Sequence, residues 1–162
     1  MLTLSIDGVD ALRTRLDAYP AALVSELAAK AQELAGALAD KVKHQKLAGE
    51  ALESRSGALA ASIAAEVAGD GEDVVATVGA FGDVKYAAIQ EYGGKTGAHE
   101  ILPSKGGVLA FVAEGAMHFA RRVQHPGSLI PERSYLRSSL DEMSAEIVAA
   151  LAAAASESWG QT

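Results

Sequence analysis

The chain has 162 residues, of which 49% are hydrophobic and 22% charged, with no cysteine and a formal net charge of −7. This size and mixture predict one globular domain over residues 1–162 that buries a core without metal or disulfide support. The absence of cysteine excludes disulfides, thiolate catalysis and cysteine-built zinc sites. The acidic balance disfavours a protein that wraps DNA or reads its sequence, because affinity for nucleic acid comes mainly from neutralising phosphates.

The N-terminal segment lacks the pattern of an export signal. Residues 1–10 alternate apolar with polar and acidic side chains, whereas a signal peptide needs a basic start and an uninterrupted apolar run. The longest apolar stretch, residues 147–155, is far shorter than the roughly 20 residues that span a bilayer. We therefore expect no signal peptide, no integral membrane segment and no membrane partner.

Residues 9–46 show the strongest local pattern, an amphipathic helix. Apolar residues recur there at spacings of three, four and seven. The stripe comprises Val9, Leu12, Leu16, Leu23, Leu27, Ala31, Leu34, Leu38 and Val42. Pro20 removes a backbone donor inside this pattern, so we expect an N-terminal arm with a short helix (residues 1–19), a break near Tyr19 and a helix from Pro20 to about Lys46. Such a helix, about 40 Å long, overhangs a small core and invites a partner.

Two shorter elements and a glycine-rich segment follow. Alternating apolar residues over 59–67 and 74–78 predict a β-hairpin that turns at residues 69–73. Residues 85–92 predict a short helix ended by Gly93 and Gly94. Residues 93–107 predict an open loop, and we interpret it as a docking loop that orders on contact with a neighbouring protein. Its candidate contact residues are Gly94, Lys95, Thr96, Gly97, His99 and Lys105.

The last third of the chain predicts two strands and a helix. Residues 108–112 and 117–123 read as strands around Gly115, followed by turns at residues 125–128 and at Pro131. Apolar spacing then predicts a helix over residues 135–155 and a tail over 156–162. The whole is an α+β fold, in which a small antiparallel sheet packs against a long N-terminal helix and a C-terminal helix.

No motif for catalysis, a cofactor or a metal is present in the sequence. Gly94-Lys95-Thr96 matches the end of a phosphate-binding loop, but Ile89 stands where the first glycine is required. The four histidines are scattered without an acidic ligand at metal spacing, and no Gly-x-Ser-x-Gly run occurs. We expect a protein that is not an enzyme and that has no cofactor and no metal.

Four arginines lie close together in the sequence. Residues 121–137 contain only one acidic side chain, Glu132, and hold Arg121, Arg122, Arg133 and Arg137. One interpretation is an electrostatic contact with an acidic neighbouring subunit or with DNA. The alternative is that these side chains flank the ends of a strand and a helix and stay hydrated.

Three stretches of the sequence carry short motifs in a fixed order. Residues 53–63 resemble the pattern S/T-G-x-L-x-x-S-I, residues 78–93 the pattern V-G … Y-A-x-I-x-E-x-G, and residues 123–136 the pattern V-x-H-P-G-T … P-x-x-F-L. Taken in this order, the three stretches resemble the lambda-type minor tail protein Z, or tail-completion, family of tailed bacteriophages. The resemblance covers about residues 20–155, with Ser128 where threonine is frequent and Tyr135 where phenylalanine is frequent. The turns and anchors that carry it are Gly57, Leu59, Tyr86, Glu91, Gly93, His125, Pro126, Gly127 and Tyr135.

The residues at these positions have a physical role of their own. Gly57, Gly79 and Gly93 fall at junctions that need a positive φ or a close approach. The imidazole of His125 is placed to hydrogen-bond the turn that follows it. We interpret Tyr86, Tyr92 and Tyr135 as core anchors rather than base-stacking platforms, because each is embedded in an apolar pattern.

The resemblance implies a non-enzymatic virion protein of the neck, assembled in the cytoplasm of the host bacterium. It implies a subunit of a ring, expected to be a hexamer, that completes the tail and joins it to the head. The implied partners are copies of the same chain, a tail terminator or tail tube protein, a head-closure or connector protein, and genomic DNA that passes through the lumen without sequence-specific contact. The alternatives are a tail terminator or head-closure (stopper) protein of the same neck, or a small DNA-end-binding assembly factor that uses the four arginines.

Overall fold

The computed structural model describes residues 9–52, 56–69, 73–104 and 106–161, and the chain divides into two compact units. The helical unit comprises the chain up to Ala87 and from Ser134 onward, and the strand unit comprises Ala88–Arg133. The single domain expected from the sequence stays a prediction.

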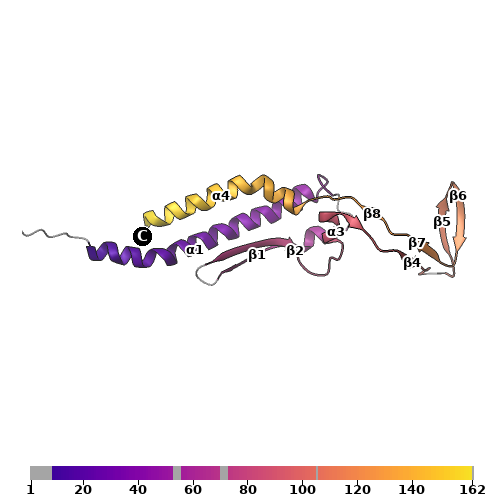
Figure 1. The fold of residues 1–162 in the computed structure, drawn as a ribbon, viewed down its shortest axis with the longest axis horizontal. Helices are drawn as coiled ribbons and strands as arrows, with labels where there is room; N and C mark the ends of the chain where they lie inside the picture. Colours follow the sequence, from indigo (N-terminus) through magenta and orange to yellow (C-terminus); the bar gives the residue numbers. More distant parts are fainter. Residues whose placement is uncertain (1–8, 53–55, 70–72, 105, 162) are drawn as a thin grey trace, which may run out of the picture. The chain divides into compact units, whose positions relative to one another are not determined.

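The helical unit is built around its first helix. It contains α1 (Val9–Lys41), the π-helical turn η1 (Val42–Lys46), α2 (Ala58–Ser62), β1 (Ile63–Gly69), β2 (Val74–Ala80) and α4 (Leu136–Gln161). Helix α1 packs against α4 on one side and against the antiparallel β1–β2 hairpin on another (Figure 1). The long N-terminal helix, the C-terminal helix and the antiparallel pairing expected from the sequence are confirmed, so the fold class is α+β.

The core of the helical unit lies where η1, α2, the start of β1 and the start of α4 meet. Its buried members are Ala39, Val42, Leu47, Leu59, Ile63 and Tyr135. The predicted stripe is confirmed at Leu34 and Leu38 in α1 and at Val42 in η1, which are buried, whereas Leu16 near the other end of α1 is half exposed. The apolar stripe is therefore used mainly in the last third of α1.

The predicted helix break near Tyr19 is wrong, because α1 runs without interruption through Pro20. Proline removes one backbone hydrogen bond to the carbonyl of the residue four positions earlier, here Leu16. Both Leu16 and Pro20 are exposed, so water can solvate the carbonyl that has lost its partner. The surrounding turns keep their hydrogen bonds, and the helix continues.

Two further boundaries in the helical unit differ from expectation. Leu59 does not begin a strand but lies in α2, and β1 begins at Ile63. Gly57 adopts a φ of +73°, and its carbonyl accepts the Ala61 N–H at 2.8 Å, which starts a helical turn in the alanine-rich segment that follows. The predicted tail over residues 156–162 is also wrong, because α4 continues to Gln161.

The strand unit consists of nested antiparallel pairs that follow α3 (Ala87–Tyr92). Strand β3 (Gly94–Lys95) pairs with β8 (Leu129–Ile130), β4 (His99–Ile101) pairs with β7 (Val123–His125), and β5 (Leu109–Ala113) pairs with β6 (Ala116–Ala120). The open loop predicted for residues 93–107 is wrong, because it contains β3 and β4. The strand predicted over residues 117–123 is two strands, since β6 ends at Ala120.

No helix in the ranges that the structure describes combines the length and the apolar character that a membrane span requires.

Candidate assembly interface

The residues of the predicted docking loop are engaged within the strand unit. Gly94 pairs with Ile130 and Lys95 with Leu129. The Thr96 N–H donates to the Ser128 carbonyl at 2.9 Å, and the Ser128 N–H donates to Thr96 Oγ1 at 2.7 Å. His99 lies in β4 opposite His125, Gly97 lies between β3 and β4, and Lys105 lies outside the described residues. This segment therefore forms strands that pair with residues 123–130, rather than a free loop.

The predicted turn at His125-Pro126-Gly127 is present, and its hydrogen bond is the one expected. The Gly127 N–H donates to His125 Nδ1 at 3.0 Å, which leaves the proton of the neutral imidazole on Nε2. The His125 ring stacks on the His99 ring with centroids 5.0 Å apart. Gly127 has a φ of +87°, and a Cβ atom there would overlap the Thr96 carbonyl. Only glycine fits this turn.

Two further motif positions are also determined by the fold. Gly93 ends α3 with a φ of +67°, and a Cβ atom there would lie 2.7 Å from the Glu132 nitrogen. Tyr135 is buried, and its hydroxyl donates to the Ala87 carbonyl at 3.1 Å. These residues shape the backbone, and the resemblance therefore falls on positions that build the fold.

The prediction that three tyrosines anchor the core is confirmed for Tyr135 and wrong for the other two. Tyr86 and Tyr92 are exposed, and the buried position of α3 is Glu91. A residue next to Glu91 lies about 100° further round the helix, so Tyr92 faces outward. The pattern did not reveal this, because a helix of six residues is too short to define an apolar stripe.

The four arginines of the predicted electrostatic interface lie at different places along the chain's elements. Arg121 and Arg122 lie between β6 and β7, and Arg122 Nη1 is 3.6 Å from Glu100 Oε1. Arg133 follows β8, and its N–H donates at 2.9 Å to the carbonyl of Gln90 in α3, which precedes the β3–β8 pair rather than the β5–β6 pair. Arg137 belongs to α4 in the helical unit. Arg121 and Arg122 remain as an exposed basic pair beside the β5–β6 hairpin.

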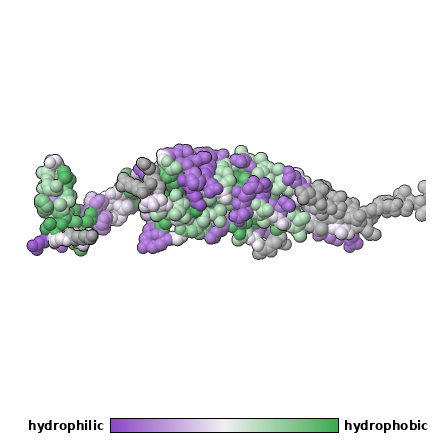
Figure 2. Space-filling view, turned by 180° about the vertical axis from the view of Figure 1, so that it is seen from behind, coloured by the Kyte–Doolittle hydropathy of each residue, from purple (hydrophilic) through white to green (hydrophobic). Residues whose placement is uncertain are grey.

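The β5–β6 hairpin carries an exposed apolar surface that was not predicted from the sequence. Directly opposed residues of an antiparallel pair share one face, so the pairs Ala110–Phe119 and Val112–Met117 lie on the same side. Phe119, Val112 and Met117 are 69%, 67% and 61% exposed, and Ala110 is exposed as well. We call these four residues the hairpin apolar face. Figure 2 shows hydrophobic residues gathered over β5 and β6.

The sequence contained a signal for this surface. Residues 108–120 hold a single charged side chain, Glu114, and no other polar residue except His118. On the opposite face of the hairpin the Phe111 and His118 rings stack with centroids 5.8 Å apart. The alternation predicted strands, but it did not show that one face of them is exposed among the described residues.

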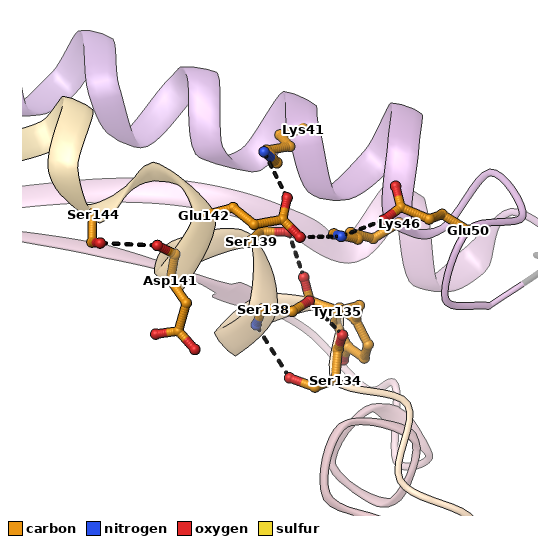
Figure 3. Close-up of polar contacts among 10 residues, drawn as sticks. All are labelled: Lys41, Lys46, Glu50, Ser134, Tyr135, Ser138, Ser139, Asp141, Glu142 and Ser144. Carbon is orange, nitrogen blue, oxygen red and sulfur yellow. Dashed lines mark hydrogen bonds and ion pairs between the residues drawn. The ribbon is translucent and has the colours of Figure 1, made fainter.

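An ion-pair network joins α4 to the end of α1 in the helical unit (Figure 3). Glu142 accepts hydrogen bonds from Lys41 at 2.8 Å and from Lys46, and Lys46 also pairs with Glu50. The hydrogen bond from Lys41, followed by that from Lys46, lowers the pKa of Glu142 below its ordinary value. The hydrogen bond to Glu142, followed by that to Glu50, raises the pKa of Lys46. Lys46 is buried, so this network holds α4 against the end of α1 from within the fold. We call these ion pairs of Glu142 the clamp.

Neither a metal centre nor a known relative assigns a function to these features. Within the ranges 9–52, 56–69, 73–104 and 106–161, no group of three or more histidine or acidic side chains could hold a metal ion. Compared with known proteins, the chain matches no family model, no curated protein and no solved structure. The similarity to the tail-completion family therefore stays a prediction from three short stretches.

Proposed function

We propose that this chain is a structural, non-enzymatic subunit of the neck of a tailed bacteriophage. It completes the tail and joins it to the head connector as one member of a ring around the DNA channel. The observation that carries the proposal is the hairpin apolar face. A lone two-stranded hairpin is marginally stable in water, and the apolar residues Val112, Met117 and Phe119 are exposed in the part of the chain that the structure describes. A subunit of this kind is completed by its neighbours in an assembly.

The resemblance to the tail-completion family adds independent support. Its three segments fall on the start of α2, on α3 with Gly93, and on the turn at Gly127. At Gly93 and Gly127 the backbone accepts only glycine. This sequence therefore agrees with the family motifs at positions that determine the course of the backbone. Such agreement is expected of chains that share a fold and an assembly role.

The distribution of charge favours a ring subunit over a DNA-end-binding factor. The helical unit holds nine basic and seventeen acidic residues, and a surface of that sign repels phosphates and lets DNA slide past. A DNA-binding factor needs a continuous basic surface. The arginines that would supply it are dispersed along the fold, and Arg122 is already paired with Glu100.

The test is to locate the chain in phage particles. Particles produced from a genome that carries this gene are purified, searched for the chain by mass spectrometry and imaged at the neck by electron cryomicroscopy. We expect a ring of this chain between connector and tail tube, and we expect unjoined heads and tails when the gene carries an early stop codon. Complete, infectious particles that lack the chain would contradict the proposal. DNA binding that weakens steeply with salt would then favour the DNA-end-binding alternative.

A further inference from the structure

The hairpin apolar face has the composition of a buried surface. Its four side chains carry no charge and no hydrogen-bonding group, so nothing polar is left unpaired when the face is covered. Together they expose on the order of 400 Å², which is the size of the largest apolar patch on a typical monomer, and such a patch is often functional. The adjoining strand ends contribute a negative charge at one end, Glu114 in the turn, and a positive charge at the other, Arg121 after β6.

We propose that this face packs against the same face of a second copy of this chain, with the two hairpins antiparallel about a two-fold axis. The axis crosses the strands at the level of Phe111 and His118. Met117 then faces Phe119 of the second copy, and Val112 faces Ala110 of the second copy. A sulfur–aromatic contact of this kind is favourable, and an interface related by a two-fold axis repeats it twice.

Charge selects this orientation. The ladder pairs Leu109 with Ala120 and Ala113 with Ala116, so the turn at Glu114 lies as far from the Phe111–His118 level as Arg121 does on the other side. The two-fold axis therefore brings Glu114 of one copy to the level of Arg121 of the other, at both ends of the contact. Within one copy these residues are about 20 Å apart along the strands, so they do not pair internally.

Charge also selects the strand unit as the place where two copies meet. Each chain carries a net charge of −7, and like charges oppose association. The strand unit holds five basic and four acidic residues and is close to neutral, so the repulsion between copies is smallest there. The face is about half the roughly 800 Å² that each partner contributes to a standard interface, so we expect a dimer that dissociates between about 1 µM and 1 mM.

The first test measures the oligomeric state of the full chain by sedimentation velocity over a concentration series up to about 1 mM. Phe119→Asp is expected to raise the dimer dissociation constant at least tenfold. The matched control is Val148→Asp on α4, whose wild-type side chain is 68% exposed, and it is expected to leave the constant unchanged. Circular dichroism of both variants verifies the fold.

The second test reverses charges. Glu114→Arg and Arg121→Glu are each expected to weaken the dimer several-fold, and the double variant is expected to restore it to within about twofold of wild type. Arg133→Glu, at the other end of the strand unit, is the control that leaves dimerisation unchanged. Restoration requires the two residues to meet between copies, because the length of the hairpin separates them within one copy.

Three results would overturn the proposal. The first is a chain that stays monomeric at every concentration, and binding of that monomer to lipid vesicles through Phe119 would assign the face to a membrane surface instead. The second is a dimer that is insensitive to Phe119→Asp, and the third is the absence of rescue by the double charge reversal. The inference concerns the free chain and does not rest on the neck function: a two-fold contact joins two copies only, so in a ring the same face would pass to a neighbouring subunit. A wild-type chain that is monomeric in solution but forms a ring in phage particles would overturn this contact and leave the proposed function standing.

Discussion

The hydroxyl of Tyr135 donates a hydrogen bond to the backbone carbonyl of Ala87, 48 residues earlier in the chain. Ala87 is the last residue of the helical unit before the chain enters the strand unit, and Tyr135 is the second residue after it returns. The bond therefore holds together the two points of the helical unit between which the whole strand unit is inserted. Tyr135 is also a member of the buried core, so the same side chain packs that core and joins these two points.

Removing this hydroxyl is expected to destabilise the helical unit. Tyr135→Phe keeps the ring but removes the partly buried hydrogen bond to the Ala87 carbonyl, which costs about 1 kcal/mol of unfolding free energy. Tyr135→Ala also removes the ring from the core and is expected to cost about 3–5 kcal/mol. Denaturant titration measures both changes. Tyr86→Phe, at an exposed tyrosine, is the control, and an equal loss in that variant would contradict the assignment.

The ion pairs of Glu142 predict a specific dependence of stability on pH. Lys41 and Lys46 lower the pKa of Glu142 in the folded protein. The ionised Glu142 therefore contributes fully to the free energy of unfolding above its ordinary pKa of 4.5, and this contribution is lost as the pH falls through the lower pKa of the folded state. The pKa of Lys46 is raised above its ordinary value of 10.5 in the folded protein. The charged Lys46 therefore contributes fully to the free energy of unfolding below pH 10.5, and this contribution is lost as the pH rises through the higher pKa of the folded state.

Glu142→Gln tests this dependence. The variant is expected to be less stable than wild type at neutral pH, and the difference is expected to shrink as pH falls below 4.5. Thermal unfolding between pH 3 and pH 7 provides the measurement. Glu146→Gln, at an exposed carboxylate one turn further along α4, should leave the pH profile unchanged. A gap between wild type and Glu142→Gln that is equally large at pH 3 would argue against the clamp.

A side chain at position 127 is expected to open the β3–β8 end of the strand unit. Gly127→Ala places a methyl group against the Thr96 carbonyl in a left-handed backbone conformation, at a cost of about 2 kcal/mol or more. Amide hydrogen exchange at Thr96 and Ser128 reports the loss, because both N–H groups donate across this ladder. Gly97→Ala is the matched control, since nothing lies within 4 Å of its Cβ position. Retained protection in Gly127→Ala would show that the turn has another solution.

Replacing Pro20 is expected to stabilise α1. Proline in a helix interior is about 3 kcal/mol less favourable than alanine, so Pro20→Ala should raise the unfolding temperature and slow hydrogen exchange in the surrounding turns. The reverse change, Ala37→Pro at an exposed position of the same helix, should be strongly destabilising. Destabilisation by Pro20→Ala would mean that the proline has a role in the folded chain beyond its helix propensity.

The elements that were predicted best from the sequence are those whose pattern is local and extends over enough residues to show a period. The helix pattern ending at Lys46 is present as α1 and η1, and the alternation around residues 63–78 is present as β1 and β2. Prediction failed for β3 and β4, which are two and three residues long. Strands of that length have no measurable period, and their partner residues lie between 22 and 36 positions further along the chain.

The turns of the candidate interface could be predicted from the sequence, whereas the hairpin apolar face could not. Gly93, His125 and Gly127 were identified because glycine and proline chemistry acts over a few residues. The Lys46–Glu142 pair was invisible because it joins residues 96 positions apart. The grouping of Arg121 with Arg137 came from closeness in sequence, and the fold places these two residues in different units. Whether an apolar strand is covered depends on packing that no local pattern records.

The nested pairing of the strand unit sets the order in which it can form. The β5–β6 turn closes a very short loop, so it is the least costly first step in chain entropy. Once it has formed, β4 and β7 are brought within reach of each other, and their pairing does the same for β3 and β8. The strand unit can thus form from its innermost pair, β5–β6, outward to the pair β3–β8. The hairpin apolar face is then complete before β3 and β8 have paired.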